Sequence, residues 1–210
     1  MDKLLILGAG GFGRMVKETA QLLGYEDVVF LDDAAKNSDV IGKCCDYAAK
    51  HEEYKVAVAA FGNNNTRLFW TDKLLEAGFE VPAIVHPSAV VSPSAVLEAG
   101  CFVMQRAVVN TNSRIGRASL INSGAVVDHD SVIGYGAHVG LGAIVKSNCT
   151  IQPKKRVEAG EVIFSTRRKI EGVDSRALED ALYAFGFGPQ CSYVKPFGEG
   201  HINETYAVYM

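Results

Sequence analysis

Residues 109–138 read VNTNSR, IGRASL, INSGAV, VDHDSV and IGYGAH, five successive groups of six that each begin with a branched aliphatic residue. The spacing continues on both sides, and four positions after each aliphatic residue, as far as Cys149, stands alanine, serine or cysteine. Neither the 3.6-residue period of a helix nor the two-residue period of a single strand explains a repeat of six. The fourteen aliphatic positions are Val85, Val91, Leu97, Val103, Val109, Ile115, Ile121, Val127, Ile133, Val139, Val145, Ile151, Val157 and Ile163.

A repeat of six is typical of a parallel β-helix, in which each group supplies one short strand and one turn. Three groups close one coil, so residues eighteen apart are expected to stack at about the inter-strand spacing, ~4.8 Å. The aliphatic residue is expected to point into the coil. The small residue is expected where the chain bends too tightly for a larger side chain.

The composition is that of an ordinary globular chain. The 210 residues carry a net charge of -3, and 48% are hydrophobic, which indicates neither a nucleic-acid surface nor disorder. The five cysteines show no metal-ligand spacing, so we expect reduced structural thiols and no metal. The N-terminus runs directly into a strand, and no apolar run is long enough to span a bilayer. We therefore expect a cytoplasmic protein without membrane or nucleic-acid partners.

The first third of the chain has the pattern of a small nucleotide-binding α/β unit. A strand at Leu4–Leu7 ends in a glycine-rich turn, a helical pattern follows to Gly24, and a strand at Val28–Leu31 ends in two aspartates. Glycines at such a turn let backbone N–H groups approach a phosphate, and the carboxylate can hold a ribose or a base. Glycine can also serve only for close packing of helix and strand. The candidate ligand residues are Gly10, Gly11, Gly13, Asp32 and Asp33.

A third strand, Val56–Phe61, leads into Gly62, an asparagine run that begins at Asn63, and then Arg67 at the start of an amphipathic helix. The asparagines can cap this helix, or they can line the crevice where open α/β sheets bind ligands. At about eighty residues, the unit is half the size of a full dinucleotide-binding domain. It suits the mononucleotide part of a substrate better than NAD.

Within the repeat, His129 stands between two aspartates, Asp128 and Asp130. An imidazole held by a carboxylate can act as a general base near neutral pH, although a histidine at a solvated turn has the same local sequence. The coil edge that bears His129 continues eighteen residues on at Ser147. His138 is half a coil away and faces elsewhere, so the two histidines could meet only across a subunit interface. This geometry predicts a homotrimer with sites between subunits.

Beyond Ile163 the repeat ends, and a helix is expected from about Asp174. The stretch 192–208 then reads as strand, glycine turn, strand. It resembles the opening hairpin of small-molecule kinases of the aminoglycoside-phosphotransferase type, including N-acetylhexosamine kinases. The kinase lysine, catalytic loop and metal-binding aspartate have no counterpart here. The resemblance implies a longer fused protein of which this chain is the amino-terminal part.

Residues 3 to about 163 resemble bacterial left-handed β-helix acyltransferases with an N-terminal Rossmann-like domain: the UDP-4-amino-sugar N-acetyltransferases and the sialic acid O-acetyltransferases. Four motifs carry the resemblance, namely the glycine-rich turn, Leu31–Asp33, Gly62–Asn63 with Arg67, and Asn122–His138. It implies a left-handed coil and a nucleotide-linked sugar bound on the N-terminal domain. It also implies acetyl-CoA as co-substrate.

The same resemblance implies roles for individual residues. His129 looks like the general base, oriented by Asp130, with Asn122 contacting the sugar. The acetyl-CoA contacts it implies are His138 from the neighbouring subunit, Gly142, and the backbone at Ser147.

Two departures from the family pattern bear on these roles. The last coils, with Gln152–Val157 and Phe164, lack the regular Gly-Val-Pro-Ala ending that helps to hold CoA, and Asp130 replaces the glutamate common in the amino-sugar enzymes. Amine and hydroxyl acceptors therefore both stay open.

We expect three regions: a Rossmann-like nucleotide-sugar-binding domain at 1–84, a left-handed β-helix acyltransferase domain at 85–163, and a linker, helix and truncated kinase-like hairpin at 164–210. The function expected is acetyl transfer from acetyl-CoA to an amine, or a hydroxyl, of a nucleotide-linked sugar. The alternatives are a sialic acid or other sugar O-acetyltransferase, a non-catalytic nucleotide-sugar scaffold fused to a kinase, and a zinc-dependent hydratase of the carbonic-anhydrase-like β-helix class.

Overall fold

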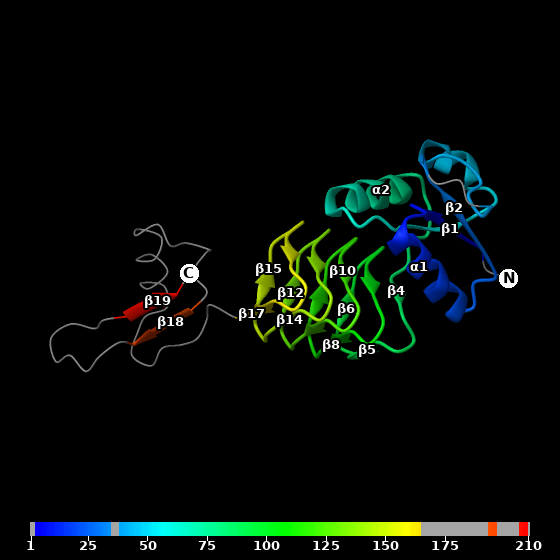
Figure 1. The fold of residues 1–210 in the computed structure, drawn as a ribbon. Helices are drawn as coiled ribbons and strands as arrows, with labels where there is room; N and C mark the ends of the chain where they lie inside the picture. Colours follow the sequence, from blue (N-terminus) through cyan, green and yellow to red (C-terminus); the bar gives the residue numbers. More distant parts are fainter. Residues whose placement is uncertain (1–2, 35–37, 165–192, 197–205, 210) are drawn as a thin grey trace.

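The computed structural model describes residues 3–34, 38–164, 193–196 and 206–209. A small α/β unit at the N-terminal end packs against one end of a parallel β-solenoid that runs away from it (Figure 1). This arrangement confirms the α/β unit and the β-helix expected from the sequence.

The N-terminal unit is a three-stranded parallel sheet with helices around it. Its strand order is β2-β1-β3, and Leu5 in the central strand aligns with Val29 and Ala57. The predicted strands and helices are all present, whereas the short 3-10 helix η1 was not predicted. The bounds are β1 Lys3–Leu7, α1 Gly11–Leu22, β2 Asp27–Leu31, η1 Cys44–Lys50, β3 Val56–Ala59 and α2 Asn64–Glu76.

The solenoid consists of strands of two residues, one for each group of six. They form three parallel sheets: the first contains β4, β7, β10, β13 and β16, the second β5, β8, β11, β14 and β17, and the third β6, β9, β12 and β15. Partners are eighteen residues apart, as in the pair Leu120–His138. The bounds are β4 Ile84–Val85, β5 Val90–Val91, β6 Val96–Leu97, β7 Phe102–Val103, β8 Val108–Val109, β9 Arg114–Ile115, β10 Leu120–Ile121, β11 Val126–Val127, β12 Val132–Ile133, β13 His138–Val139, β14 Ile144–Val145, β15 Thr150–Ile151, β16 Arg156–Val157 and β17 Val162–Ile163.

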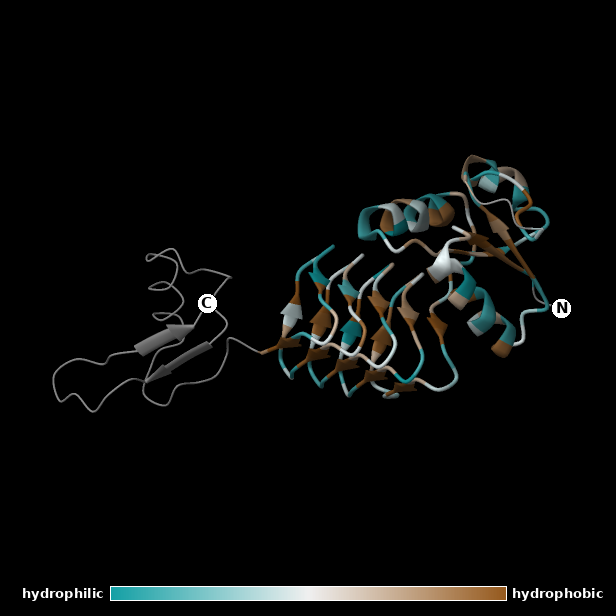
Figure 2. Ribbon diagram, in the orientation of Figure 1, coloured by the Kyte–Doolittle hydropathy of each residue, from teal (hydrophilic) through white to brown (hydrophobic). Residues whose placement is uncertain are grey.

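The interior of the solenoid is built from the second residue of each strand and from the small residues. Val103 and Ile121 are fully buried, and so are Ala107 and Ala125. Figure 2 shows the resulting concentration of hydrophobic residues along the strands. Buried serines in the small positions donate hydrogen bonds to turn carbonyl oxygens, as Ser113 does to Asp128 at 2.7 Å.

The tightest bend is not at the small residue, and this part of the expectation was wrong. The backbone is left-handed one position earlier, at Asn112 (φ 57°) and Asp130 (φ 57°) among others, and the small residue that follows points inward. Asparagine, aspartate and glycine are the residues that adopt this conformation most readily. The left-handed positions recur every six residues, at Gly100, Arg106, Asn112, Ala118, Gly124, Asp130, Gly136, Gly142, Asn148, Lys154 and Gly160.

The N-terminal unit covers the outer face of the first sheet over β4, β7 and β10. Ile84, Phe102 and Leu120 point outward from that sheet, and they are buried in the same hydrophobic cluster as the core of the N-terminal unit. The rings of Phe12 and Phe102 meet edge to face with their centroids 5.1 Å apart. Aromatic pairs of this kind contribute about 0.5–1.5 kcal/mol beyond their buried area.

Near the C-terminus, β18 (Tyr193–Pro196) pairs antiparallel with β19 (Tyr206–Tyr209). Two paired strands were expected here, whereas the helix expected from about Asp174 lies outside the described residues. Among the helices that the structure describes, none is long and apolar enough to cross a membrane.

Candidate active site

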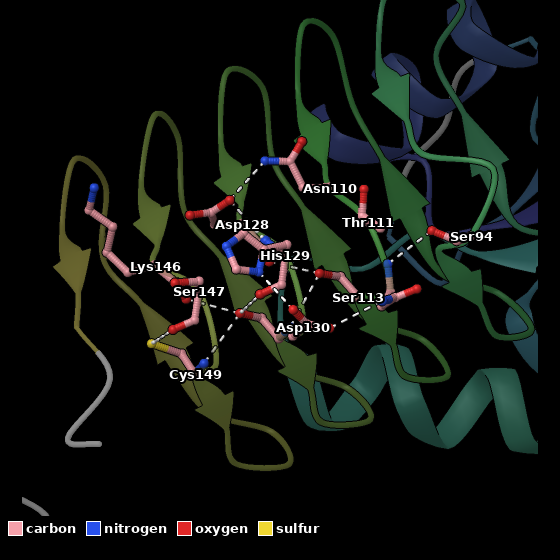
Figure 3. A network of polar contacts seen from close by, with 12 residues as sticks. Ser94, Asn110, Thr111, Ser113, Asp128, His129, Asp130, Lys146, Ser147 and Cys149 are labelled. Carbon is pink, nitrogen blue, oxygen red and sulfur yellow. Dashed lines mark hydrogen bonds and ion pairs between the residues drawn. The ribbon is translucent and has the colours of Figure 1, made fainter. Parts of the chain in front are cut away.

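His129 lies in the turn that joins the second sheet to the third. Its Nδ1 atom is 2.7 Å from Oδ2 of Asp130, and about half of each side chain is exposed. Figure 3 shows the imidazole of His129 and the carboxylate of Asp130 next to each other on the surface of the coil. The hydrogen bond to Asp130 raises the pKa of His129, and the same bond lowers the pKa of Asp130. The pairing leaves Nε2 as the ring nitrogen that can accept a proton.

Asp128 fixes the backbone of the same turn. Its Oδ1 atom accepts hydrogen bonds from the N–H of His129 at 2.9 Å and from Nδ2 of Asn110 at 3.0 Å. The bond from Asn110, with that from the His129 N–H, lowers the pKa of Asp128. Asp128 therefore stays an anion that holds the turn. In the sequence, Asp128 stands out only as a neighbour of His129, and Asn110 precedes it by eighteen positions, one coil away.

Ser147 lies one coil further along the same edge. In the equivalent turn, the N–H of Asn148 donates to the carbonyl of His129 at 3.1 Å. The N–H of Ser147 itself has no hydrogen-bond acceptor within the part of the chain that the structure describes. Among the described residues this backbone donor has no acceptor, and Ser147 lies close to His129 (Figure 3).

His138 and Asn122 form a second polar pair, on the first sheet. His138 is 6% exposed, and its Nε2 atom is 3.2 Å from Nδ2 of Asn122. Burial, together with the positive charges of Arg67 and Arg156, lowers the pKa of His138 to about 4. The ring is therefore neutral at pH 7, with Nε2 as the acceptor and Nδ1 carrying the proton. Nδ1 is buried without a hydrogen-bond partner among the described residues.

The two histidines belong to different sides of the prism. His138 points outward from the first sheet, whereas His129 lies at the edge between the second and third sheets. Gly142 lies at another edge, between the first and second sheets, where a Cβ atom would meet nothing within 4 Å. Within one chain, His129 is therefore separated from His138 and Gly142, while Asn122 pairs with His138 and Ser147 lies on the edge of His129.

The glycines of the N-terminal turn fall into two classes. A Cβ atom at Gly10 or Gly11 would meet nothing within 4 Å, so the backbone there is open to a ligand. A Cβ atom at Gly13 would overlap the carbonyl oxygen of Gly8, so this glycine permits close packing of α1 on β1. Gly13 thus has the close-packing role, whereas ligand binding at Gly10 and Gly11 stays a prediction.

The aspartates after β2 hold backbone groups. Asp32 accepts hydrogen bonds from the N–H of Ala9 at 2.7 Å and from the N–H of Ala34 at 2.8 Å. Asp33 accepts one from the N–H of Cys44 at 3.0 Å. Asp32 consequently shapes the glycine-rich turn that precedes α1.

The asparagine run caps α2. Oδ1 of Asn63 accepts hydrogen bonds from the N–H of Thr66 at 3.0 Å and from its hydroxyl at 3.2 Å. Asn64 donates to the carbonyl of Lys154 on the solenoid at 3.0 Å. An open cavity of about 250 Å³ lies between these elements, lined by Gly62, Asn63, Asn64, Asn65, Lys154 and Arg156.

Arg67 is buried completely, and each nitrogen of its guanidinium donates a hydrogen bond. Burial lowers its pKa to about 10, so it stays protonated at neutral pH. With its donors engaged inside the protein, Arg67 lies in the domain contact and not on an open ligand surface. Its acceptors are the carbonyl oxygens of Ala118, Phe61, Gly62, Gly136 and Ala137 and the side chain of Asn64.

The two buried thiols of the solenoid are not activated. Cys101 is buried in the coil, and burial raises its pKa to about 12. Burial also raises the pKa of Cys149, next to the His129 edge. Among the described residues, no group of three or more His, Cys, Asp and Glu side chains is arranged to hold a metal ion.

Residues 3–74 match the PglD N-terminal domain family. The chain is also similar to PerB from Caulobacter crescentus, solved in complex with CoA and GDP-perosamine, at 31% identity and a TM-score of 0.67, over 78% of this chain and 89% of that one. It is similar to the acetyltransferase domain of PglB from Neisseria gonorrhoeae at 32% identity and a TM-score of 0.60, over 78% of this chain and 92% of that one. That domain has also been solved with acetyl coenzyme A, at 32% identity and a TM-score of 0.58, over 77% and 90%.

The α/β unit, the solenoid and these likenesses define the class of protein, an acetyltransferase with a hexapeptide-repeat β-solenoid. Within that class, the chain belongs to the family of sugar N-acetyltransferases that carry a PglD N-terminal domain.

Proposed function

We propose that this chain transfers the acetyl group of acetyl-CoA to an amine of a nucleotide-linked sugar, with His129 as the general base. The observation that carries the assignment to His129 is the 2.7 Å contact between its Nδ1 atom and Asp130, which leaves an exposed Nε2 atom free to accept a proton. The relatives solved with CoA and a GDP-linked amino sugar, and with acetyl coenzyme A, support the substrate classes.

The reaction follows from this geometry. Nε2 of His129 takes a proton from the acceptor nitrogen as that nitrogen forms a bond to the thioester carbonyl carbon. The carbonyl π electrons move to the oxygen and give a tetrahedral oxyanion. When they return, the C–S bond breaks, and the imidazolium gives its proton to the leaving CoA sulfur. Asp130 stabilises the imidazolium through Nδ1 without taking the proton, as the acid does in a histidine–carboxylate pair.

The N–H of Ser147 is the proposed donor to the oxyanion. It lies one coil below His129 and has no acceptor among the described residues. A preorganised donor at this position is worth about 3 kcal/mol of transition-state stabilisation in other acyl-transfer enzymes. The buried, protonated thiols of Cys101 and Cys149 favour direct transfer over a covalent acyl-enzyme.

The N-terminal unit is the proposed binding site for the nucleotide part of the acceptor. Gly10 and Gly11 expose backbone at the start of α1, where a phosphate is favourable. The carboxylates of Asp32 and Asp33 lie at the carboxyl end of β2, where ribose or base contacts are made in such units. Gly62 and Asn63 border the open cavity between the start of α2 and the solenoid.

We further propose a homotrimer, because the site is incomplete in one chain. The outer face of the first sheet is covered by the N-terminal unit over β4, β7 and β10, and that of the third sheet is mixed, with Arg114 and Thr150. The outer face of the second sheet is wholly aliphatic and lies between the His129 edge and the Gly142 edge. A neighbour that covers this face could bring its Asn122 and His138 to His129. The aliphatic stripe consists of Val90, Val108, Val126, Ile144 and Val162.

In this arrangement acetyl-CoA lies along the cleft between two copies, near His138, Gly142 and Ser147. Because acetyl-CoA is the proposed donor, we place the reaction in the cytoplasm. The fusion to a kinase stays a prediction based on the resemblance of residues 192–208.

The decisive experiment is a thiol-release assay with acetyl-CoA and a panel of GDP-, UDP- and TDP-linked 4-amino sugars, with sialic acid as the hydroxyl acceptor. Turnover of one amino sugar should fall by about 10²- to 10⁴-fold in His129→Asn. His86→Asn is the matched control, since His86 also lies in a solenoid turn, but its Nδ1 atom accepts from Ser88 within that turn. Full activity of His129→Asn would overturn the assigned base, and turnover of sialic acid alone would favour O-acetyl transfer.

A further inference from the structure

We propose that Asn112 is a positioning residue for this reaction, acting on His129 through Asp130. The inference rests on the proposed function of His129. Nδ2 of Asn112 donates to Oδ1 of Asp130 at 3.2 Å, while Oδ2 of the same carboxylate contacts His129 at 2.7 Å. Each oxygen of Asp130 thus has its own donor, and the plane of the carboxylate is fixed from two sides.

Asn112 is itself held in place. It stands eighteen residues before Asp130, one coil away in the stacking register, and has the same left-handed backbone. Its N–H donates to Oγ of Ser94 at 3.1 Å, eighteen residues earlier again. Asparagine adopts this conformation readily, and its short side chain places the amide within hydrogen-bonding distance of Asp130 in the next coil. The column Ser94–Asn112–Asp130 therefore runs along one edge of the solenoid and ends at His129.

A second column runs beside it. Asn110 donates to Asp128, and Asp128 accepts from the N–H of His129, so the amide of Asn110 supports the backbone of the turn. The amide of Asn112 supports the side-chain contact. The charged groups that face His129 are Asp130 and Asp128 on its own turn, with Lys146 from the next coil facing Asp128.

The consequence concerns the tautomer and the direction of the imidazole. A carboxylate held ionised and in one orientation accepts from Nδ1–H, which keeps Nε2 unprotonated and pointing away from the coil. Without the amide of Asn112, Asp130 can rotate about its side-chain bonds at a half-exposed site, and the fraction of His129 in the productive orientation falls. Because Asn112 does not line the proposed substrate sites, binding should be unaffected.

The test uses Asn112→Ala and the isosteric Asn112→Asp in the full chain, with the acceptor found in the thiol-release assay. Asn112→Ala should lower kcat by about tenfold and leave KM for both substrates unchanged. Asn112→Asp adds a negative charge beside Asp130, which favours the imidazolium. The acidic limb of the kcat–pH profile should therefore move to higher pH, by about half a unit at low ionic strength.

The matched control is Arg106→Ala. Arg106 occupies the same left-handed position at another edge, and Ala118 shows that alanine is accommodated there with φ 56°. Unchanged kcat in Asn112→Ala, a loss no larger than in Arg106→Ala, or an unshifted limb in Asn112→Asp would each overturn the positioning role. If His129→Asn is inactive while Asn112→Ala is fully active, only this inference fails; if His129→Asn is active, the proposed function fails first.

Discussion

The Nε atom of Arg67 donates a hydrogen bond to the carbonyl oxygen of Ala118 at 2.7 Å, from α2 to a solenoid turn 51 residues further along the chain. The same guanidinium reaches the carbonyl oxygens of Gly136 and Ala137 in the next coil at 3.1 and 3.2 Å. One side chain therefore joins the N-terminal unit to two coils. Because it also binds the carbonyl of Phe61 just before α2, it fixes the start of that helix relative to the solenoid.

Arg67→Lys should destabilise the protein although it keeps the charge. A lysine cannot supply the planar set of donors, so several buried carbonyl groups would lose their partners, at a cost of about 3 kcal/mol in the free energy of unfolding. Urea unfolding followed by circular dichroism measures this difference. Arg106→Lys at an exposed turn is the control and should differ from wild type by less than about 0.5 kcal/mol. Equal stability of the two variants would refute a fastening role for Arg67.

Gly13→Ala should lower the stability of the protein, whereas Gly10→Ala should weaken substrate binding. Gly13→Ala places a methyl group against the carbonyl oxygen of Gly8 and should lower the free energy of unfolding by about 2 kcal/mol. Gly10→Ala meets open space, so the fold should be unaffected, while KM for the sugar nucleotide rises severalfold because the methyl group faces the ligand. Thermal unfolding measures the stability of both variants, and substrate titration measures their KM values. A normal KM in Gly10→Ala would remove this turn from the proposed binding site.

His138 should make the protein sensitive to acid. Burial holds its folded pKa near 4, below the ordinary value of 6.5, so the unfolded chain binds a proton that the folded chain does not. Stability from this group is complete above pH 6.5 and is lost as the pH falls toward 4, by an amount on the order of 2 kcal/mol. Urea unfolding at pH 7 and pH 4.5 measures the loss. In His138→Gln the difference between the two pH values should shrink, and an unchanged difference would assign it to other groups.

Val126→Lys should dissociate the proposed trimer. Val126 lies in the middle of the aliphatic stripe on the second sheet, and a charge there cannot be buried cheaply against a second copy. Sedimentation should show monomers, and turnover should be lost because the site needs two chains. Val132→Lys is the matched control: Val132 is an exposed strand valine of the adjacent third sheet. If Val126→Lys sediments like the control, the stripe is not the interface.

Most of the fold could be predicted from the sequence because the solenoid repeats one local environment many times. Every strand from β4 to β17 contains its aliphatic residue as the second of two, so periodicity alone located the strands. The α/β unit was recognisable from its glycine-rich turn and its strand pattern. The position of the bend could not be predicted. The left-handed residue directly precedes the small inward residue, and the residue types alone do not tell which of the two lies at the bend.

The site was predictable only where the partners lie close together in the sequence. The pair His129–Asp130 is local, and the contact between them is present. The burial of Arg67 and its hydrogen bonds to the solenoid were not predictable. Its acceptors come from coils that are distant in sequence and meet it only after the domains dock. Asn112 was missed as well, although the eighteen-residue register held the signal: it is the position directly above Asp130.

A left-handed residue recurs every six positions, and every third one lies on the same edge of the solenoid. Loss or gain of eighteen residues would remove or add one complete coil and keep each polar column on its own edge. Loss of six would still leave every aliphatic residue inside, so the coil could close, but all later residues would move to the next side of the prism. Ser147 would then no longer stand beneath His129. The length of this protein can vary in whole coils, whereas its chemistry tolerates no other step.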